Sequence, residues 1–182
     1  MMTVAMCGGS VTTVWAQSGY VWLIDEDSVR RGEVREFFND GKGRGVEIKR
    51  WNKLQEKYYF NRVREFATKR DTFRVFNELQ LAHGKAYWME VALARPVCRG
   101  KTNLYALRPT TYVMSTIWGN ASEILILEDP ETGEVRPLTD NITEVLLDFI
   151  PPEEIEGFLS KHGKAEYRDL RSLICTFNAN RR

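Results

Sequence analysis

Apolar and polar positions in the first half of the chain follow the pattern of short β-strands. Four runs rich in β-branched and aromatic residues are separated by Gly, Asp, Ser and Asn, and they cover residues 11–15, 20–24, 34–38 and 46–51. Strands of this length and spacing are expected in a small barrel or meander. We therefore predict that the N-terminal half is β-structure rather than helix.

A β-hairpin is predicted further along the chain, over residues 124–138. The apolar run Ile124 to Leu127 leads into a polar turn in which Pro130 presets φ and Gly133 accepts a positive φ. A short return strand follows at residues 135–138.

Helical spacing replaces the strand pattern after this hairpin. Residues 139–141 offer N-cap oxygens, and the apolar residues that follow recur at helical spacing: Ile142, Val145, Leu146 and Phe149. Pro151 and Pro152 end this helix, and the acidic residues after them favour the first turn of a second one, which ends near Gly163. A third helix is predicted over 164–174, with a frayed tail at 178–182.

Three blocks of this sequence, in order, are similar to one known family. They are "GEVREFFNDGKGRGVEIKRW" at 32–51, "NELQLA" at 77–82, and a hairpin and helix segment whose turn reads "EDPETGEVRPL". Together they resemble the BAH (bromo-adjacent homology) domain of the largest subunit of the origin recognition complex and of its fungal silencing paralogue. The resemblance covers roughly residues 18–160.

The resemblance implies a mainly β fold with helices, of the α+β class. Its core would be a distorted β-barrel, residues 52–74 would be a partly helical insertion, and helices would follow at the C-terminus. The chain has 182 residues, which suits one hydrophobic core, so we expect a single domain over 1–182, with the C-terminal helix and tail from 161 onward.

Composition narrows the setting in which the protein works. No run approaches the roughly 20 apolar residues of a membrane span, and no Lys or Arg precedes Tyr20, so we expect neither a membrane partner nor a signal peptide. Cys7, Cys98 and Cys175 are few and far apart, which predicts inert thiols rather than a disulfide framework or a zinc cluster. No cofactor or metal is expected.

Charge is distributed unevenly along the chain, although the net charge is only +1. Residues 42–74 contain 11 Lys or Arg against 4 Asp or Glu, whereas residues 121–170 contain 4 against 13. The basic segment suits an acidic partner such as DNA or the acidic surface of a histone octamer, or else a solvated face over a core. If the residues after Trp51 were helical, Lys53, Lys57 and Arg64 would lie on one exposed side.

The family resemblance implies a chromatin reader, not an enzyme, that works in the nucleus in replication origin function or gene silencing. Its partners would be nucleosomes or histone tails, with DNA contacted through residues 42–74. We expect Arg30 and Arg31 in a loop that meets the nucleosome, although the N-terminal basic arm of the silencing paralogue is absent. The candidate nucleosome-binding residues are Arg30, Arg31, Lys42, Arg44, Lys49, Arg50 and Lys53.

Some relatives instead hold a methylated lysine in an aromatic cage by cation–π attraction. In the "NELQLA" strand, Gln80 and Leu81 stand where these readers carry aromatic residues. The candidates that remain for a cage are Trp51, Tyr58, Tyr59 and Tyr87.

Two other functions stay open. A BAH domain can dock a replication or silencing protein and scarcely touch nucleosomes. A metal-dependent nuclease would use Asp40 and Glu47 to hold a divalent ion and Lys49 to assist the attacking water.

Overall fold

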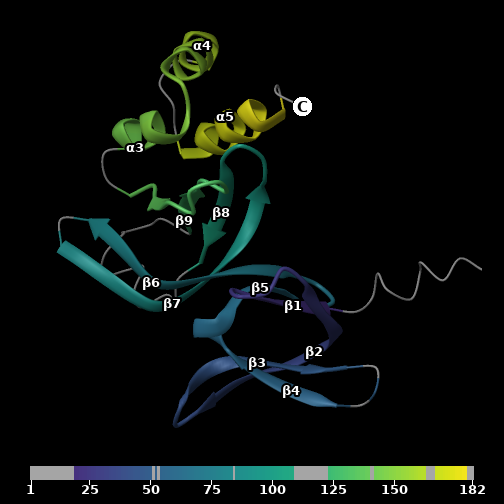
Figure 1. Ribbon diagram of the computed structural model, residues 1–182. Helices are drawn as coiled ribbons and strands as arrows, with labels where there is room; N and C mark the ends of the chain where they lie inside the picture. The colour runs from purple at the N-terminus through teal and green to yellow at the C-terminus, as the bar shows by residue number, and fades with distance from the viewer. Residues whose placement is uncertain are drawn as a thin grey trace, which may run out of the picture. The chain divides into compact units, whose positions relative to one another are not determined.

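A computed structural model describes residues 19–50, 52, 54–83, 85–108, 123–139, 142–162 and 167–179. The fold is mainly antiparallel β-sheet with three helices among these residues, so the predicted class, mainly β with helices, is confirmed. The chain divides into two compact units, residues 1–71 and 72–182, which are described separately below (Figure 1). The single domain that we expected stays a prediction.

Unit 1 is an open antiparallel sheet with the strand order β5-β1-β2-β3-β4. Its elements are β1 (Gly19–Leu23), β2 (Val29–Asp40), β3 (Gly43–Lys49), β4 (Gln55–Tyr59), the 3-10 helix η1 (Phe60–Arg62) and β5 (Val63–Ala67). The strands predicted at 20–24, 34–38 and 46–51 are confirmed, with β2 longer than expected. The strand predicted at 11–15 lies outside the described residues.

The prediction that residues 52–74 form a partly helical insertion is largely wrong. Among the described residues of that segment, only the three of η1 are helical, and β4, β5 and the start of the next strand account for most of the rest. Tyr58, Tyr59, Val63 and Phe66, which lie in β4 and β5, are aromatic or β-branched, and such side chains favour the extended backbone of a half-buried sheet.

Unit 2 begins with two long strands and continues through three short ones. These are β6 (Thr72–His83), β7 (Lys85–Cys98), β8 (Asn103–Leu107), β9 (Ile124–Glu128) and β10 (Val135–Pro137), in the order β10-β9-β8-β7-β6. The predicted β9–β10 hairpin is confirmed, and Gly133 in its turn has a φ of 74°. Asp129 stabilises the turn, because its carboxylate accepts the backbone N–H of Glu131 at 2.7 Å.

Three helices complete unit 2: α3 (Ile142–Phe149), α4 (Pro152–His162) and α5 (Tyr167–Ala179). All three were predicted, and Pro152 opens α4, where its missing N–H costs no helical hydrogen bond. The prediction of a frayed tail is wrong for its first two residues, because Asn178 and Ala179 belong to α5 and the Asn178 side chain is buried. Residues 180–182 lie outside the described part of the chain.

The middle strands of unit 2 are covered on both sides. One core cluster joins β8 and β9 to the helices through Leu104, Leu127, Leu146, Ile155 and Ile174, among others, and Figure 1 shows the helices gathered beside these strands. A second cluster, with Tyr105 and Ile126, joins them to β6 and β7. Burial on both faces explains why β9 is a continuous apolar run rather than an alternating one.

Candidate functional site

Side-chain alternation gives the sheet of unit 1 two different faces. Val21, Val46, Ile48 and Phe66 are fully buried and point to one side, which we call the inner face. Residues directly opposite one another on paired strands share a face, so the strand register identifies the other side, the outer face. It carries Tyr20, Trp22, Arg31, Glu33, Phe38, Glu47, Lys49, Gln55, Lys57 and Tyr59.

Three cations lie on this outer face. Arg31 and Lys57 are exposed and Lys49 is half-buried, and no ion pair joins any of the three to another described residue. The face also carries carboxylates. Glu33 binds Arg35 at 3.1 Å, and the register adds Glu47, Asp40 and the buried Glu65. The outer face therefore offers a partner three cations without an ion pair, and these cations lie among carboxylates.

Aromatic rings lie beside these cations. The Lys57 ammonium lies 5.1 Å from the centre of the Phe38 ring, and Phe38 meets Tyr59 edge-on with ring centres 5.3 Å apart. The Phe38 ring covers Gly45, where a Cβ atom would stand 2.7 Å from Phe38 Cζ and 2.2 Å from the Tyr58 carbonyl oxygen. Only glycine permits this close approach, so the ring and the cation above it are held against the strand.

A second cation–aromatic pair lies on β1 and β5. The guanidinium of Arg64 stands 4.6 Å from the centre of the Trp22 ring. Trp22 is itself fixed, because its indole N–H donates to the backbone oxygen of Glu26 at 2.7 Å.

Two further cations occupy the tip of the β2–β3 hairpin. Lys42 and Arg44 are exposed, and neither forms an ion pair within the described part of the chain. The tip is shaped locally, since Asp40 accepts the Lys42 N–H at 3.1 Å and Gly43 has a φ of 147°. The predicted residues Lys42 and Arg44 are thus exposed to solvent.

Arg30 and Arg50 differ from the other predicted cations, because acidic residues already bind them. Arg30 donates two hydrogen bonds to the Glu26 carboxylate, at 2.8 and 2.9 Å, and Arg50 donates to Glu56 at 3.2 Å. The prediction that Arg30 and Arg31 lie in a loop is wrong. Both residues lie in β2, and they point to opposite faces of the sheet.

The same contacts shift the pKa values of Glu26, Glu56 and Tyr58. The hydrogen bond from Arg30 lowers the pKa of Glu26, and the hydrogen bonds from the Tyr58 hydroxyl and then Arg50 lower that of Glu56. Burial and the Glu56 carboxylate raise the pKa of Tyr58 to about 12. Arg30 and Arg50 are therefore parts of a local ion-pair group rather than cations available to a partner.

The aromatic cage is not assembled from the described side chains. Tyr58 and Tyr59 are adjacent on β4, so they point to opposite faces and do not line one cage together. Trp51, like Lys53 of the basic set, lies outside the described residues, and so does the side chain of Tyr87, a residue of β7.

The nuclease residues are also kept apart. Asp40 pairs with Gly43, and Glu47 lies four residues further along β3, which corresponds to about 13 Å at the rise of a β-strand. Two carboxylates that share a divalent ion each approach it to about 2.5 Å. Within the described ranges, no group of three or more His, Cys, Asp or Glu residues is placed to hold a metal.

Sequence reasoning did not find Lys57 and Phe38 as neighbours. A helical segment would place Lys57 on one side with Lys53 and Arg64, whereas Lys57 lies on β4 opposite Glu47. The alternation in "QEKYY" was the available signal, but five residues fit a strand and a helix about equally well.

Cys98 and Cys175 form a disulfide, so the prediction of inert thiols is wrong for this pair. Their 77 residues of sequence separation hid the pairing, which depends on how α5 packs. Cys7 lies outside the described residues.

Comparison with known proteins gives no relative: no family model, no curated protein and no solved structure matches this chain. In the described part of the chain, no helix combines the length and the apolar character needed to cross a membrane.

Proposed function

We propose that this chain is a non-enzymatic binding module that contacts an acidic macromolecule through the outer face and the hairpin tip of unit 1. The observation that carries the proposal is the placement of Arg31, Lys49 and Lys57 on one face of three neighbouring strands, without an ion pair to any described residue. Lys42 and Arg44 extend the positive charge to the hairpin tip.

The chemistry of the outer face suits such contacts. Exposed cations attract an acidic partner and accelerate its approach, and they discriminate against basic surfaces. Phe38 and Trp22 add aromatic area that is already held in place by Gly45 and by the indole hydrogen bond. Because Glu33, Asp40, Glu47 and Glu65 share the face, the attraction is weak and sensitive to salt.

The family resemblance supplies the most specific version of this proposal, a BAH-type chromatin module with a distorted barrel core. In that version the partner is a nucleosome or a histone tail, and the module acts in the nucleus in replication or silencing. Its support is the three sequence blocks in their order and the basic segment at 42–74. Arg31 and Lys49 would then replace the expected pair of Arg30 and Arg31 as the contact to the particle.

A titration with three probes tests the chromatin version. Purified protein is titrated against reconstituted nucleosomes, nucleosomes with a neutralised acidic patch, and naked DNA of the same length. The chromatin version predicts tightest binding to intact nucleosomes. Equal binding to naked DNA would reduce the contact to general attraction for phosphate, and the absence of binding to all three would contradict the chromatin version.

Protein docking outside the nucleus is the second candidate, and the disulfide favours it. Disulfides persist in oxidising compartments and are rare in the nucleus. The acidic partner would then be a protein surface rather than chromatin. Polyglutamate serves as a probe of carboxylate binding: salt-sensitive binding to it without preference for nucleosomes would favour this candidate.

A further inference from the structure

The disulfide between Cys98 and Cys175 joins the last residue of β7 to the middle of α5. The two Cα atoms are 5.7 Å apart, within the ordinary range for a disulfide. The bond closes a large loop that contains β8, β9, β10, α3 and α4. It therefore ties the C-terminal helix to the sheet of unit 2 by a covalent bond.

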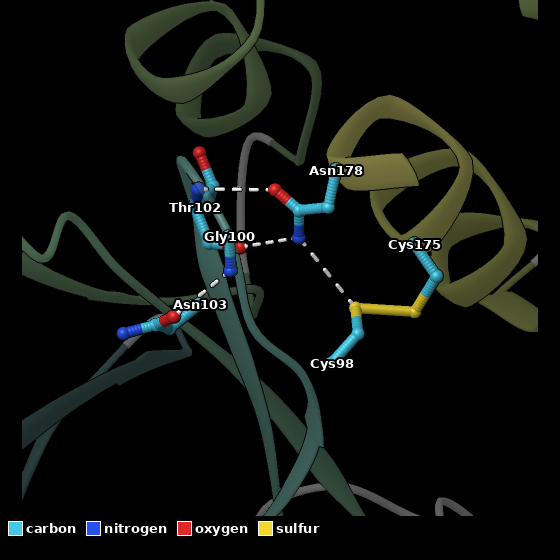
Figure 2. The surroundings of a disulfide bond; sticks show 6 residues. All are labelled: Cys98, Gly100, Thr102, Asn103, Cys175 and Asn178. Carbon is cyan, nitrogen blue, oxygen red and sulfur yellow. Dashed lines mark hydrogen bonds between the residues drawn. A yellow bond between two sulfur atoms is a disulfide. The ribbon is translucent and has the colours of Figure 1, made fainter. Parts of the chain in front are cut away.

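A buried amide on the next turn of α5 reinforces this connection (Figure 2). The side chain of Asn178 accepts the backbone N–H of Thr102 at 3.2 Å and donates to the backbone oxygen of the same residue at 2.7 Å. Its nitrogen also lies 3.8 Å from Cys98 Sγ. The β7–β8 turn is thus held by α5 at the Cys98 sulfur and at the backbone N–H and oxygen of Thr102.

Two other contacts fit this turn closely to its neighbours. The Thr102 hydroxyl donates to the backbone oxygen of Phe149 at 3.2 Å, at the end of α3. At Gly100, an added Cβ would lie 2.5 Å from Asn178 Oδ1, so the glycine leaves the room that the amide occupies. The turn, α3 and α5 consequently meet at one point beside the disulfide.

Packing of α5 also holds the two cysteines beside each other. Leu170, Leu173, Ile174 and Phe177 of α5 are buried in the cluster against β8 and β9, and both cysteine side chains border that cluster. A helix held in this way presents Cys175 to Cys98 at a fixed distance. Such an arrangement favours one specific disulfide over random oxidation.

We propose that the Cys98–Cys175 bond is a structural clasp of unit 2 and that the protein attains its stable form in a compartment that oxidises thiols. The bond forms by exchange with a disulfide-bonded donor protein. Cys98 and Cys175 give up two protons and two electrons, and the donor disulfide takes these up and becomes a dithiol. In the stable form, α5 is bonded covalently to β7.

This inference goes beyond the proposed function and does not rest on it. The proposed function concerns unit 1, whereas the clasp lies wholly within unit 2. If the clasp is oxidised in the cell, the acidic-partner proposal stands and the nuclear version of it falls.

The first test measures the thiols directly. Free thiols are trapped by alkylation in the cells that naturally make the protein, and the cysteine peptides are identified by mass spectrometry without reduction. The clasp predicts a linked peptide that contains Cys98 and Cys175. Alkylated, unlinked peptides for both residues would overturn the inference.

The second test measures the contribution of the bond to stability. Reduction of the full-length protein is expected to lower Tm by about 10 °C, because the unfolded chain then loses the constraint of a long closed loop. The double variant Cys98→Ser with Cys175→Ser should show the lower Tm with or without reductant, whereas Cys7→Ser should behave like the parent. A parent Tm that does not change on reduction would also overturn the clasp, even if the double variant failed to fold.

Discussion

Arg74 and Glu128, 54 residues apart in the sequence, form a largely buried ion pair within unit 2. Arg74 Nε donates to Glu128 Oε1 at 3.0 Å, and only 2% of the Glu128 surface is exposed. The Tyr105 hydroxyl and the Asn103 amide donate to the other carboxylate oxygen, at 2.6 and 3.1 Å. The carboxylate is therefore both paired and hydrogen-bonded, which is what allows a charge to be buried.

Removal of Arg74 should destabilise the protein strongly. The variant Arg74→Met leaves the Glu128 charge buried without its counter-ion, so we expect a loss of about 3–5 kcal/mol in the free energy of unfolding, measured by urea denaturation. Arg136→Met is the matched control, because its ion pair with Glu134 is exposed to solvent and should change stability much less. Equal effects of the two variants would show that the buried pair is not essential.

The Glu128 carboxylate should make the free energy of unfolding depend on pH. Burial alone would raise the pKa of Glu128, but the hydrogen bonds from Arg74, Tyr105 and Asn103 together hold it below the ordinary value of 4.5. A depressed pKa gives stability that is present above about pH 4.5 and is lost as the pH falls through the folded-state pKa.

Denaturation of the parent and of Glu128→Gln at about pH 6 and about pH 3 tests this dependence. The parent should lose more stability on acidification than the variant, which has no carboxyl group to protonate at this position. An identical loss in both proteins would mean that Glu128 does not titrate differently in the folded and unfolded states.

The Tyr58 hydroxyl should lose its proton at a higher pH than an ordinary tyrosine. Burial, followed by the hydrogen bond to Glu56, raises its pKa to about 12, so its hydroxyl contributes stability that is present below about pH 10 and lost as the pH rises through 12. The difference in tyrosinate absorbance between the parent and Tyr58→Phe should have its midpoint near 12. Glu56→Gln should lower that midpoint, and a midpoint near 10 in the parent would contradict the contact.

Glu78 is a non-glycine residue with a positive φ, 54°, inside β6. This backbone region is unfavourable for side chains with a Cβ, so Glu78→Gly should raise the free energy of unfolding by about 0.5–1 kcal/mol. The control is Glu90→Gly on β7. Glu90 has no positive φ, so this change should lower the free energy of unfolding by a similar amount, about 0.5–1 kcal/mol. Destabilisation by both variants would show that Glu78 is not strained.

Sequence reasoning predicted the parts of the fold whose causes are local. The β9–β10 turn depends on Asp129 and Gly133 within a few residues of one another, and α3 ends because Pro151 and Pro152 follow it. Each signal acts over one turn of chain, so the residues alone are sufficient to identify it.

Features that depend on distant residues were not predictable in the same way. The sequence around Tyr58 and Tyr59 is compatible with a helix or a strand. The segment forms a strand because it pairs with β3. From sequence alone, Arg30 was an available cation. In the structure, the turn between β1 and β2 places Glu26 beside it, and the two residues form an ion pair. Cys98 and Cys175 meet only because α5 packs against β8 and β9.

The candidate site was accordingly predicted only in part. Arg31 and Lys49 were both identified, and the strand register places them on one face. Lys57 and Phe38 joined them once β4 was recognised as a strand. Charge along a sequence indicates how many cations exist, whereas the register of the sheet decides which of them share a surface.

The most direct measurement for the outer face is the affinity of a triple variant, Arg31→Gln with Lys49→Gln and Lys57→Gln, for reconstituted nucleosomes over a range of salt. Nucleosomes present both carboxylates and phosphates, and the matched control removes three exposed cations of unit 2, Lys101, Arg108 and Arg136, also by change to Gln. We predict about tenfold weaker binding for the outer-face variant at low salt, since each exposed contact contributes about 0.5 kcal/mol, and a smaller difference at high salt. The control should bind like the parent. Equal weakening by the two variants would contradict the claim that the outer face meets an acidic partner, and no binding by the parent would contradict the chromatin version of that claim.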